Sequence, residues 1–194
     1  MLLIIDNQSQ YLRQFKRHYL DDREIPHLII DHNEQIDFQR LPSISGLIIS
    51  GGRGNPYEPL NLTTNYVAMM NLEVPTIGFC LGHEIIAVAY GAKIKRLHDY
   101  QSRKERIVIT EAKDEIFKGL GKTEVFIQKR HRFHIPTPPE EFDVLAYSEV
   151  CPVEIIRHKE KPIYGFQGHP EVSGNDGLLM TGNFLSLCGI KITD

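Results

Sequence analysis

The chain has 194 residues and a formal net charge of −3, with 41% hydrophobic and 24% charged residues. This composition is typical of a globular protein with a sizeable core, and we expect a single domain spanning residues 1–194. The small net charge gives no reason to expect nucleic-acid or membrane binding, and no apolar run approaches transmembrane length.

The three cysteines, Cys80, Cys151 and Cys188, lie far apart and form no Cys-x-x-Cys motif. This spacing argues against a disulfide framework or a zinc site, so we expect no metal and no cofactor. The first residues lack the basic start and cleavage site of a secretory signal. Together these features predict a cytoplasmic protein.

The first half of the chain alternates short apolar runs, typical of buried strands, with segments of helical spacing. The expected strands are residues 2–5, 27–30, 46–50 and 76–79. The expected helices are residues 9–20, 63–71 and 83–90, with Thr63 or Thr64 as a cap of the second and Gly91 ending the third. This alternation predicts a mostly parallel open sheet flanked by helices.

The second half changes to short strands separated by turns, followed by a closing helix at residues 176–187. The expected strands are residues 106–110, 124–128, 143–147, 153–157 and 162–166. We therefore expect an α/β fold with a strand-rich second half on the same sheet. Ligands of such sheets bind beyond the carboxyl ends of the strands, where Ser50, Phe79 and Phe166 are placed.

Cys80 lies in the segment Gly-Phe-Cys-Leu-Gly-His-Glu, directly after an apolar strand and directly before a helix. A cysteine in such a strand-to-helix elbow is held exposed at the sheet edge, and flanking glycines relieve the crowding. The helix start favours the reactive thiolate form. We interpret Cys80 as a nucleophile; the alternative is a small buried apolar residue.

A cysteine nucleophile needs a base and a group that orients the base. His169 and Glu171 follow the last expected strand, and residues two apart in an extended segment point the same way. We predict that Glu171 orients the imidazole of His169 toward Cys80. In isolation, His-Pro-Glu is also compatible with a surface turn.

The elbow, the later His-Pro-Glu and the early Ser50-Gly51-Gly52 together resemble the class I (triad-type) glutamine amidotransferases. The stretch from Cys151 to Gly165 and the opening Ile-Ile-Asp-Asn resemble the glutaminase of GMP synthase, in the archaeal form made as a separate subunit. The resemblance implies a flavodoxin-like fold and hydrolysis of the glutamine amide through a γ-glutamyl thioester. The ammonia would go to a separate ATP-pyrophosphatase synthetase subunit that aminates XMP to GMP.

The oxyanion of this reaction needs donors fixed in advance. The N–H of Leu81, directly after the nucleophile, is one candidate. Gly52 is the other, because a glycine lets the main chain approach the substrate closely. The Gly-rich segment at residues 50–56 lacks a Gly-Lys-Ser/Thr ending, so it is not a phosphate-binding loop.

The chain departs from the family pattern around the expected substrate. Glu84 replaces the glutamine after the elbow histidine, and Gly168 replaces an aromatic residue, which leaves room beside the base. His131 matches a family histidine, but Phe133 stands where an aspartate holds the amino group of glutamine. Gln8 replaces a glycine near the first strand.

Glu84, His131 and Phe133 are therefore the expected substrate-binding residues, in an altered shell. Two explanations of these departures compete. In the first, the enzyme recognises glutamine differently, or only when its partner closes the site. In the second, the chain is a cysteine hydrolase of another γ-glutamyl or amide substrate, or a catalytically impaired subunit that regulates a partner.

Overall fold

The computed structural model describes residues 1–58 and 61–191. Its strands are β1 (Leu2–Asp6), β2 (His27–Asp31), β3 (Gly46–Ile49), β4 (Thr76–Phe79), β5 (Lys95–Gln101), β6 (Lys104–Ile109), β7 (Glu124–Gln128), β8 (His131–His134), β9 (Phe142–Tyr147), β10 (Ile155–His158) and β11 (Ile163–Phe166). Its α-helices are α1 (Leu12–Phe15), α2 (Thr63–Asn71), α3 (Leu81–Ala89) and α4 (Asn175–Leu187). Shorter helical segments are η1 (Lys16–Leu20), η2 (Asp21–Arg23), η3 (Glu115–Phe117) and η4 (Pro170–Val172).

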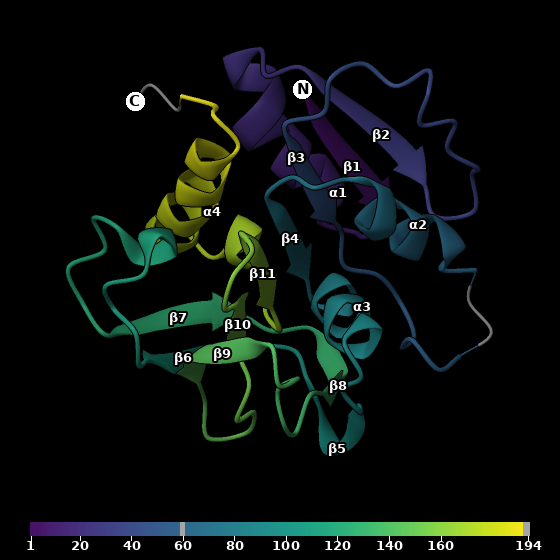
Figure 1. Ribbon diagram of the computed structural model, residues 1–194. Helices are drawn as coiled ribbons and strands as arrows, with labels where there is room; N and C mark the ends of the chain where they lie inside the picture. Colours follow the sequence, from purple (N-terminus) through teal and green to yellow (C-terminus); the bar gives the residue numbers. More distant parts are fainter. Residues whose placement is uncertain (59–60, 192–194) are drawn as a thin grey trace.

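One large sheet runs through the molecule (Figure 1). Within the described residues it has nine strands in the order β2-β1-β3-β4-β11-β10-β9-β6-β7. The pairs from β2 to β11 are parallel, and the pairs from β11 to β7 are antiparallel. The expected α/β fold, with an open sheet and a strand-rich second half, is confirmed.

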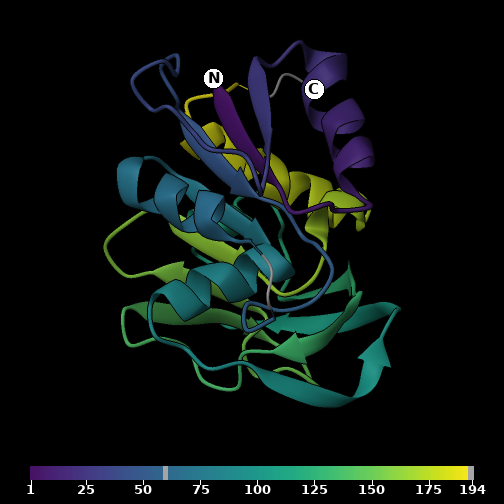
Figure 2. The ribbon, with the colours of Figure 1, turned by 90° about the vertical axis from the view of Figure 1, so that its right-hand side faces the viewer.

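Helices cover both faces of the sheet (Figure 2). Successive side chains of a strand point to opposite faces. In β1, Leu2 and Ile4 therefore pack with Phe15 of α1 and Phe184 of α4, whereas Leu3 and Ile5 belong to the cluster of α2 and α3. Nearly all side chains of β1 and β3 are inaccessible to solvent, which explains their uninterrupted apolar sequences.

Strands β5 and β8 were not expected from the sequence. They form a separate antiparallel pair below the main sheet in Figure 1. Most residues of β5 are exposed, so its sequence lacks the alternation of apolar and polar residues by which strands are recognised.

The start of the first helix and the cap of the second also differ from the expectation. The first helix begins at Leu12, because the Asp6 carboxylate accepts hydrogen bonds from the N–H groups of Gln8 and Ser9 and holds these residues in a turn. Helix α2 has Leu62 at its N-cap without a side-chain hydrogen bond. The Thr64 hydroxyl donates instead to the Glu34 carbonyl oxygen at 2.5 Å.

No helix of the described segments is both long and apolar enough to cross a membrane.

Candidate active site

The loops that follow β1, β3, β4 and β11 meet at the carboxyl edge of the parallel strands. A pocket of about 610 Å³ opens there. It is lined by Gln8, Ser9, Gln10, Tyr11, Gly52, Arg53, Gly54, Glu58, Cys80, Leu81, Glu84, Tyr100, Arg130, His131, Arg132, Phe133 and His169. Segments distant in sequence thus converge at the edge where the topology predicts a ligand site.

Cys80 occupies the N-cap of α3 with φ of 51° and ψ of −105°. A positive φ is unfavourable for a residue with a side chain, so surrounding contacts must impose this backbone conformation. The Cys80 N–H donates to the Phe166 carbonyl oxygen at 2.7 Å, which ties the elbow to the end of β11.

Two glycines let α3 leave the sheet at this sharp angle. A β-carbon on Gly82 would lie 2.2 Å from the Ile49 carbonyl oxygen, and one on Gly78 would lie 2.4 Å from the Gly82 backbone. Larger residues would push the helix away from the strands. The flanking glycines therefore fit the role expected from the sequence.

His169 and Glu171 lie together at the end of β11. The His169 Nδ1 and the Glu171 Oε1 are 2.8 Å apart, and both side chains are buried. The His169 N–H donates to the Gln128 carbonyl oxygen at 2.9 Å, which fixes the backbone at this point. The Tyr11 ring packs edge-on against the imidazole, with the centroids 4.6 Å apart.

His169 is strongly basic. Burial by itself lowers its pKa, but the Glu171 carboxylate and interactions with Cys80 outweigh that effect and raise the pKa to about 10. At neutral pH the imidazole is therefore mainly the imidazolium, the form that results from transfer of the Cys80 thiol proton. With Nδ1 engaged by Glu171, Nε2 is the nitrogen left for that transfer.

Gly51 lies between the side chains of Cys80 and His169. A β-carbon there would be 2.9 Å from the His169 Cε1 and 3.5 Å from the Cys80 Cβ. Gly52 follows, so close to Leu81 that a β-carbon would be 2.8 Å from its Cδ2. Among the described residues, the N–H groups of Gly52 and Leu81 have no hydrogen-bond acceptor.

Glu84, His131 and Phe133 all line the pocket. The Glu84 Oε1 accepts a hydrogen bond from the Gln167 Nε2 at 3.3 Å, and its Oε2 has no partner in the described part of the chain. Burial raises the pKa of Glu84 to about 8, an effect that Gln167 opposes and the Glu58 charge reinforces. Glu84 is therefore mainly a neutral carboxylic acid at neutral pH.

His131 is also neutral. Burial, together with nearby Lys129, lowers its pKa to about 4. The His131 Nδ1 donates to the Phe133 carbonyl oxygen at 2.7 Å. The ring of Phe133 is half-buried and adds an apolar wall to the pocket.

Gln8 and Gly168, two departures from the family pattern, differ in how the surrounding structure accommodates them. Gln8 adopts φ of 64°, a conformation that favours glycine, so the longer side chain is accommodated with backbone strain. The expectation of free space beside Gly168 was wrong. A β-carbon there would be 2.4 Å from the Ile127 Cγ2 and 3.4 Å from the Lys129 stem, so neighbouring side chains fill that space.

Several lining residues escaped the sequence analysis as site candidates, among them Arg53, Glu58, Tyr100 and Arg130. Arg53 and Glu58 lie in the loop after β3, and Tyr100 comes from the unexpected β5. Isolated charged residues in a polar loop form no sequence pattern that would identify them as site residues. Only the pairing of β5 with β8 brings Tyr100 to the pocket.

Comparisons with known proteins show the family of the chain. The family model "Glutamine amidotransferase class-I" matches residues 3–186. The chain belongs to this family. The resemblance to it in the sequence is thereby confirmed.

Similar proteins narrow the position within the family. The protein named as the glutamine-hydrolyzing GMP synthase subunit of Methanococcus aeolicus is 36% identical, over 98% of both chains. The protein of the same name from Methanothermobacter thermautotrophicus is 35% identical, over 97% of this chain and 98% of the other. A protein from Thermoplasma acidophilum assigned to GMP synthase superposes with a TM-score of 0.83 at 28% identity, covering 97% and 93% of the two chains.

A more distant structure agrees in fold. A glutamine amidotransferase from Thermotoga maritima has a TM-score of 0.72 at 15% identity, with 97% of this chain and 93% of that chain covered.

Proposed function

We propose that the chain is the glutaminase subunit of a two-subunit GMP synthase. It releases ammonia from the side-chain amide of glutamine for a separate ATP-pyrophosphatase subunit that converts XMP to GMP. The observation that carries this proposal is the grouping of Cys80 and His169 at one pocket, with Glu171 bound to the His169 ring. It occurs in a chain that matches glutamine-hydrolyzing GMP synthase subunits over nearly its full length.

In the first half of the reaction, His169 accepts the thiol proton and the Cys80 sulfur attacks the amide carbon of glutamine. The electron pair of the C=O bond moves to oxygen and forms a tetrahedral oxyanion. Its collapse breaks the C–N bond, and the imidazolium protonates the leaving nitrogen. The products of this half are ammonia and a γ-glutamyl thioester on Cys80.

In the second half, His169 takes a proton from water as the water oxygen attacks the thioester carbon. Collapse of the second oxyanion breaks the C–S bond and releases glutamate. The proton held by His169 returns to the Cys80 sulfur. Glu171 keeps the imidazole in one tautomer and stabilises the imidazolium in both halves.

The N–H groups of Gly52 and Leu81 stabilise both oxyanions. Both residues line the pocket together with Cys80, and within the described residues their N–H groups lack acceptors. Donors held in place before the reaction lower the barrier because they need no reorganisation as charge develops.

The direct test is glutamate release from glutamine by wild type and Cys80→Ala, alone and with the synthetase subunit, ATP and XMP. We expect release by the wild type to increase with the synthetase, and Cys80→Ala to lower it by about a thousandfold or more. GMP synthesis from added ammonium chloride should be unchanged by Cys80→Ala, which controls for the integrity of the complex. Equal glutamate release by wild type and Cys80→Ala would contradict the proposal.

A second candidate function is hydrolysis of another γ-glutamyl compound. The observation that favours it is the pocket volume, about 610 Å³, with Phe133 as an apolar wall. A screen of γ-glutamyl peptides separates the two functions. Turnover of such a peptide, with no release from glutamine in the presence of the synthetase, would support the second.

A further inference from the structure

The charges around the catalytic pocket are unequal. Among its described lining residues, Arg53, Arg130 and Arg132 are cationic, and Glu58 and Glu84 are the acids. The three guanidinium groups have no carboxylate within 4 Å in the described part of the chain, although Arg132 lies over the Tyr100 ring at 5.7 Å. The pocket is therefore well supplied with partners for an anionic group.

A free amino acid carries an α-ammonium group as well as an α-carboxylate, and that cation needs a counter-charge. Glu84 is a poor partner, because its carboxyl is buried and mainly protonated at neutral pH. Glu171 does not line the pocket and is engaged with His169. Of the described acidic side chains that line the pocket, Glu58 is thus the exposed one.

The loop after β3 holds Glu58 in place. The side-chain amide of Asn55 donates to the Glu58 Oε1 at 2.7 Å, and the Glu58 N–H donates to the Asn55 carbonyl oxygen at 3.1 Å. Asn55 is buried and also accepts a hydrogen bond from the Tyr57 N–H at 2.9 Å. A carboxylate supported in this way is oriented before substrate binds, which lowers the entropic cost of pairing.

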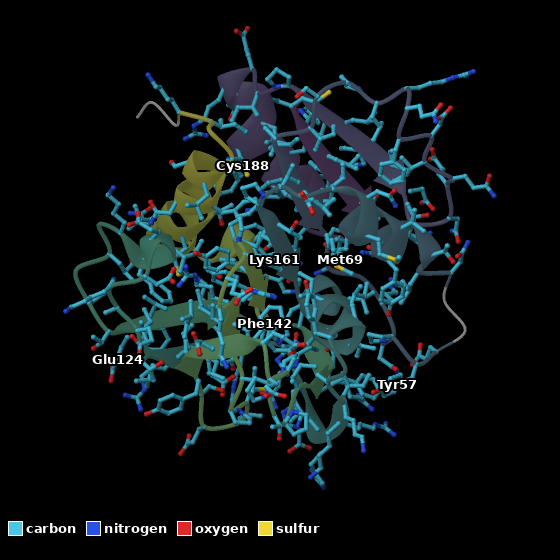
Figure 3. All side chains as sticks on the ribbon, in the orientation of Figure 1. Tyr57, Met69, Glu124, Phe142, Lys161 and Cys188 are labelled. Carbon is cyan, nitrogen blue, oxygen red and sulfur yellow. The ribbon has the colours of Figure 1, made fainter. Side chains whose placement is uncertain are left out.

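Glu58 also lines the same pocket as Cys80 and Glu84. Its charge contributes to the raised pKa of Glu84, which comes from the first turn of α3, directly behind Cys80. The neighbouring Tyr57 is labelled at the lower right of Figure 3. The Tyr57 hydroxyl donates to the Ala92 carbonyl oxygen at 3.4 Å, which connects the loop to the segment after α3.

We propose that the Glu58 carboxylate binds the α-ammonium group of glutamine while the arginines at the mouth attract its α-carboxylate. Glu58 thereby selects a zwitterionic amino acid over amides that lack the ammonium group. This inference rests on the proposed glutaminase function and assigns to one residue the recognition of the end of the substrate remote from the reacting amide.

The test compares wild type with Glu58→Gln on two substrates, L-glutamine and glutaramate, which is glutamine without its amino group. Reactions contain the synthetase subunit, ATP and XMP. We expect Glu58→Gln to raise KM for glutamine about fivefold, as for a partly exposed ion pair, with kcat within about twofold. KM for glutaramate should stay unchanged, because that substrate has no cation for Glu58 to bind.

Glu73→Gln is the matched control. Glu73 is exposed and precedes β4, at the opposite end of the strand from the pocket, so the same change of charge there should alter neither KM. An unchanged KM for glutamine in Glu58→Gln, or an equal rise for both substrates, would overturn the assignment.

A binding measurement separates failure of this inference from failure of the proposed function. Glutamine binding is measured by calorimetry with Cys80→Ala and with Cys80→Ala/Glu58→Gln, each in complex with the synthetase. About fivefold weaker binding by the double variant supports the Glu58 assignment even if the wild type releases no glutamate. Equal binding by both variants, or no binding by either, overturns it.

Discussion

At the scale of single residues, Glu84 has one of the most strongly shifted pKa values in the pocket. Its position in the first turn of α3 is favourable for a negative charge, yet the side chain is almost fully buried and one carboxyl oxygen has no partner in the described structure. The cost of removing a carboxylate from water outweighs the helix-terminal effect and raises the pKa to about 8. A neutral acid at this position can donate one hydrogen bond, as an amide can.

This ionisation links stability to pH. In the folded state Glu84 keeps its proton up to a pH of about 8, whereas in the unfolded chain it loses the proton near 4.5. Between these values the folded state binds more protons, so the contribution of Glu84 to the free energy of unfolding falls as pH rises, by up to about 1.4 kcal/mol per unit.

We therefore predict that Glu84→Gln stabilises the protein relative to wild type at pH 8 and less so at pH 5. Urea unfolding of both proteins at several pH values measures the difference, and the other titrating groups contribute equally to both curves. Parallel pH dependences for the two proteins would show that Glu84 is ionised at neutral pH. Glu73→Gln, with the same change at an exposed position, should follow the wild type.

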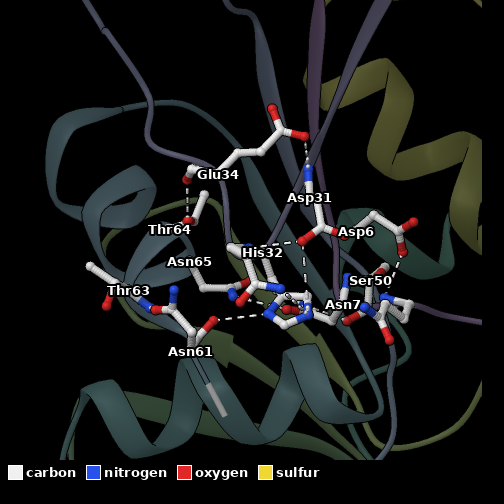
Figure 4. A network of polar contacts seen from close by, with 12 residues as sticks. Asp6, Asn7, Asp31, His32, Glu34, Ser50, Asn61, Thr63, Thr64 and Asn65 are labelled. Atoms are coloured by element: carbon white, nitrogen blue, oxygen red, sulfur yellow. Dashed lines mark hydrogen bonds and ion pairs between the residues drawn. The ribbon is translucent and has the colours of Figure 1, made fainter.

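At the scale of elements, a polar network connects the ends of β1 and β3 with α2 (Figure 4). The Asn7 side-chain amide donates to the Ser50 carbonyl oxygen and to the Asn65 Oδ1, both at 3.1 Å, and the Asn65 amide donates back to the Asn7 Oδ1 at 2.9 Å. The Asn7 N–H donates to the Ser50 hydroxyl at 2.9 Å. All three residues are buried, so their mutual bonds replace water.

This network stands directly behind the loop that carries Gly52. A β-carbon on Gly52 would be 2.4 Å from the Asn7 carbonyl oxygen, which shows how closely the loop packs against the network. The position of the Gly52 N–H therefore depends on Asn7, and the position of Asn7 depends on Asn65 of the neighbouring helix.

We predict that Asn65→Leu lowers kcat for glutamine by about tenfold or more, because removal of the Asn7 partner displaces the Gly52 N–H, which we propose as an oxyanion donor. KM should change less, since the Glu58 side of the pocket is untouched. Steady-state kinetics with the synthetase complex measures both constants. Asn71→Leu is the matched control: this exposed asparagine, at the end of the same helix, donates to the Val67 carbonyl oxygen at 2.8 Å. A reduction in kcat equal to that of the control would contradict the role of the network.

At the scale of the whole molecule, a buried ion pair joins the β7–β8 connection to the segment before β10. Lys129 and Glu154 are in direct contact, with side-chain exposures of 0% and 1%. The Lys129 N–H also donates to the Arg103 carbonyl oxygen at 2.8 Å, which links the pair to the β5–β6 turn. The pair therefore lies where the small β5–β8 sheet meets the main sheet.

Removal of one member of this pair leaves an uncompensated buried charge. We predict that Lys129→Met lowers the free energy of unfolding by about 3–5 kcal/mol, and that the double variant Lys129→Met/Glu154→Leu recovers most of that loss. Urea unfolding monitored by circular dichroism measures both changes. A double variant no more stable than the single one would contradict this account.

An exposed ion pair provides the comparison. Lys122 and Asp176 are 2.8 Å apart but remain in contact with solvent. Lys122→Met should therefore change the free energy of unfolding by less than about 1 kcal/mol.

The sequence by itself determined the elements that a short stretch of consecutive residues specifies. The apolar runs of β1, β3 and β4 are recognisable because both faces of these strands are covered, and the elbow at Cys80 is recognisable because strand, glycines and helix follow within a few residues. These elements, with the His-Pro-Glu segment after β11, were enough to predict the fold class, the family and the candidate triad.

Other features were decided by the tertiary structure, because they depend on what surrounds a residue rather than on its neighbours in the chain. Burial sets the protonation of Glu84, and packing of Ile127 and Lys129 fills the space beside Gly168. The β5–β8 pairing brings Tyr100 and Arg132 together, and the loop after β3 brings Glu58 to the pocket. Desolvation, close packing and long-range pairing all arise from contacts between distant segments, and no local pattern of residues encodes them.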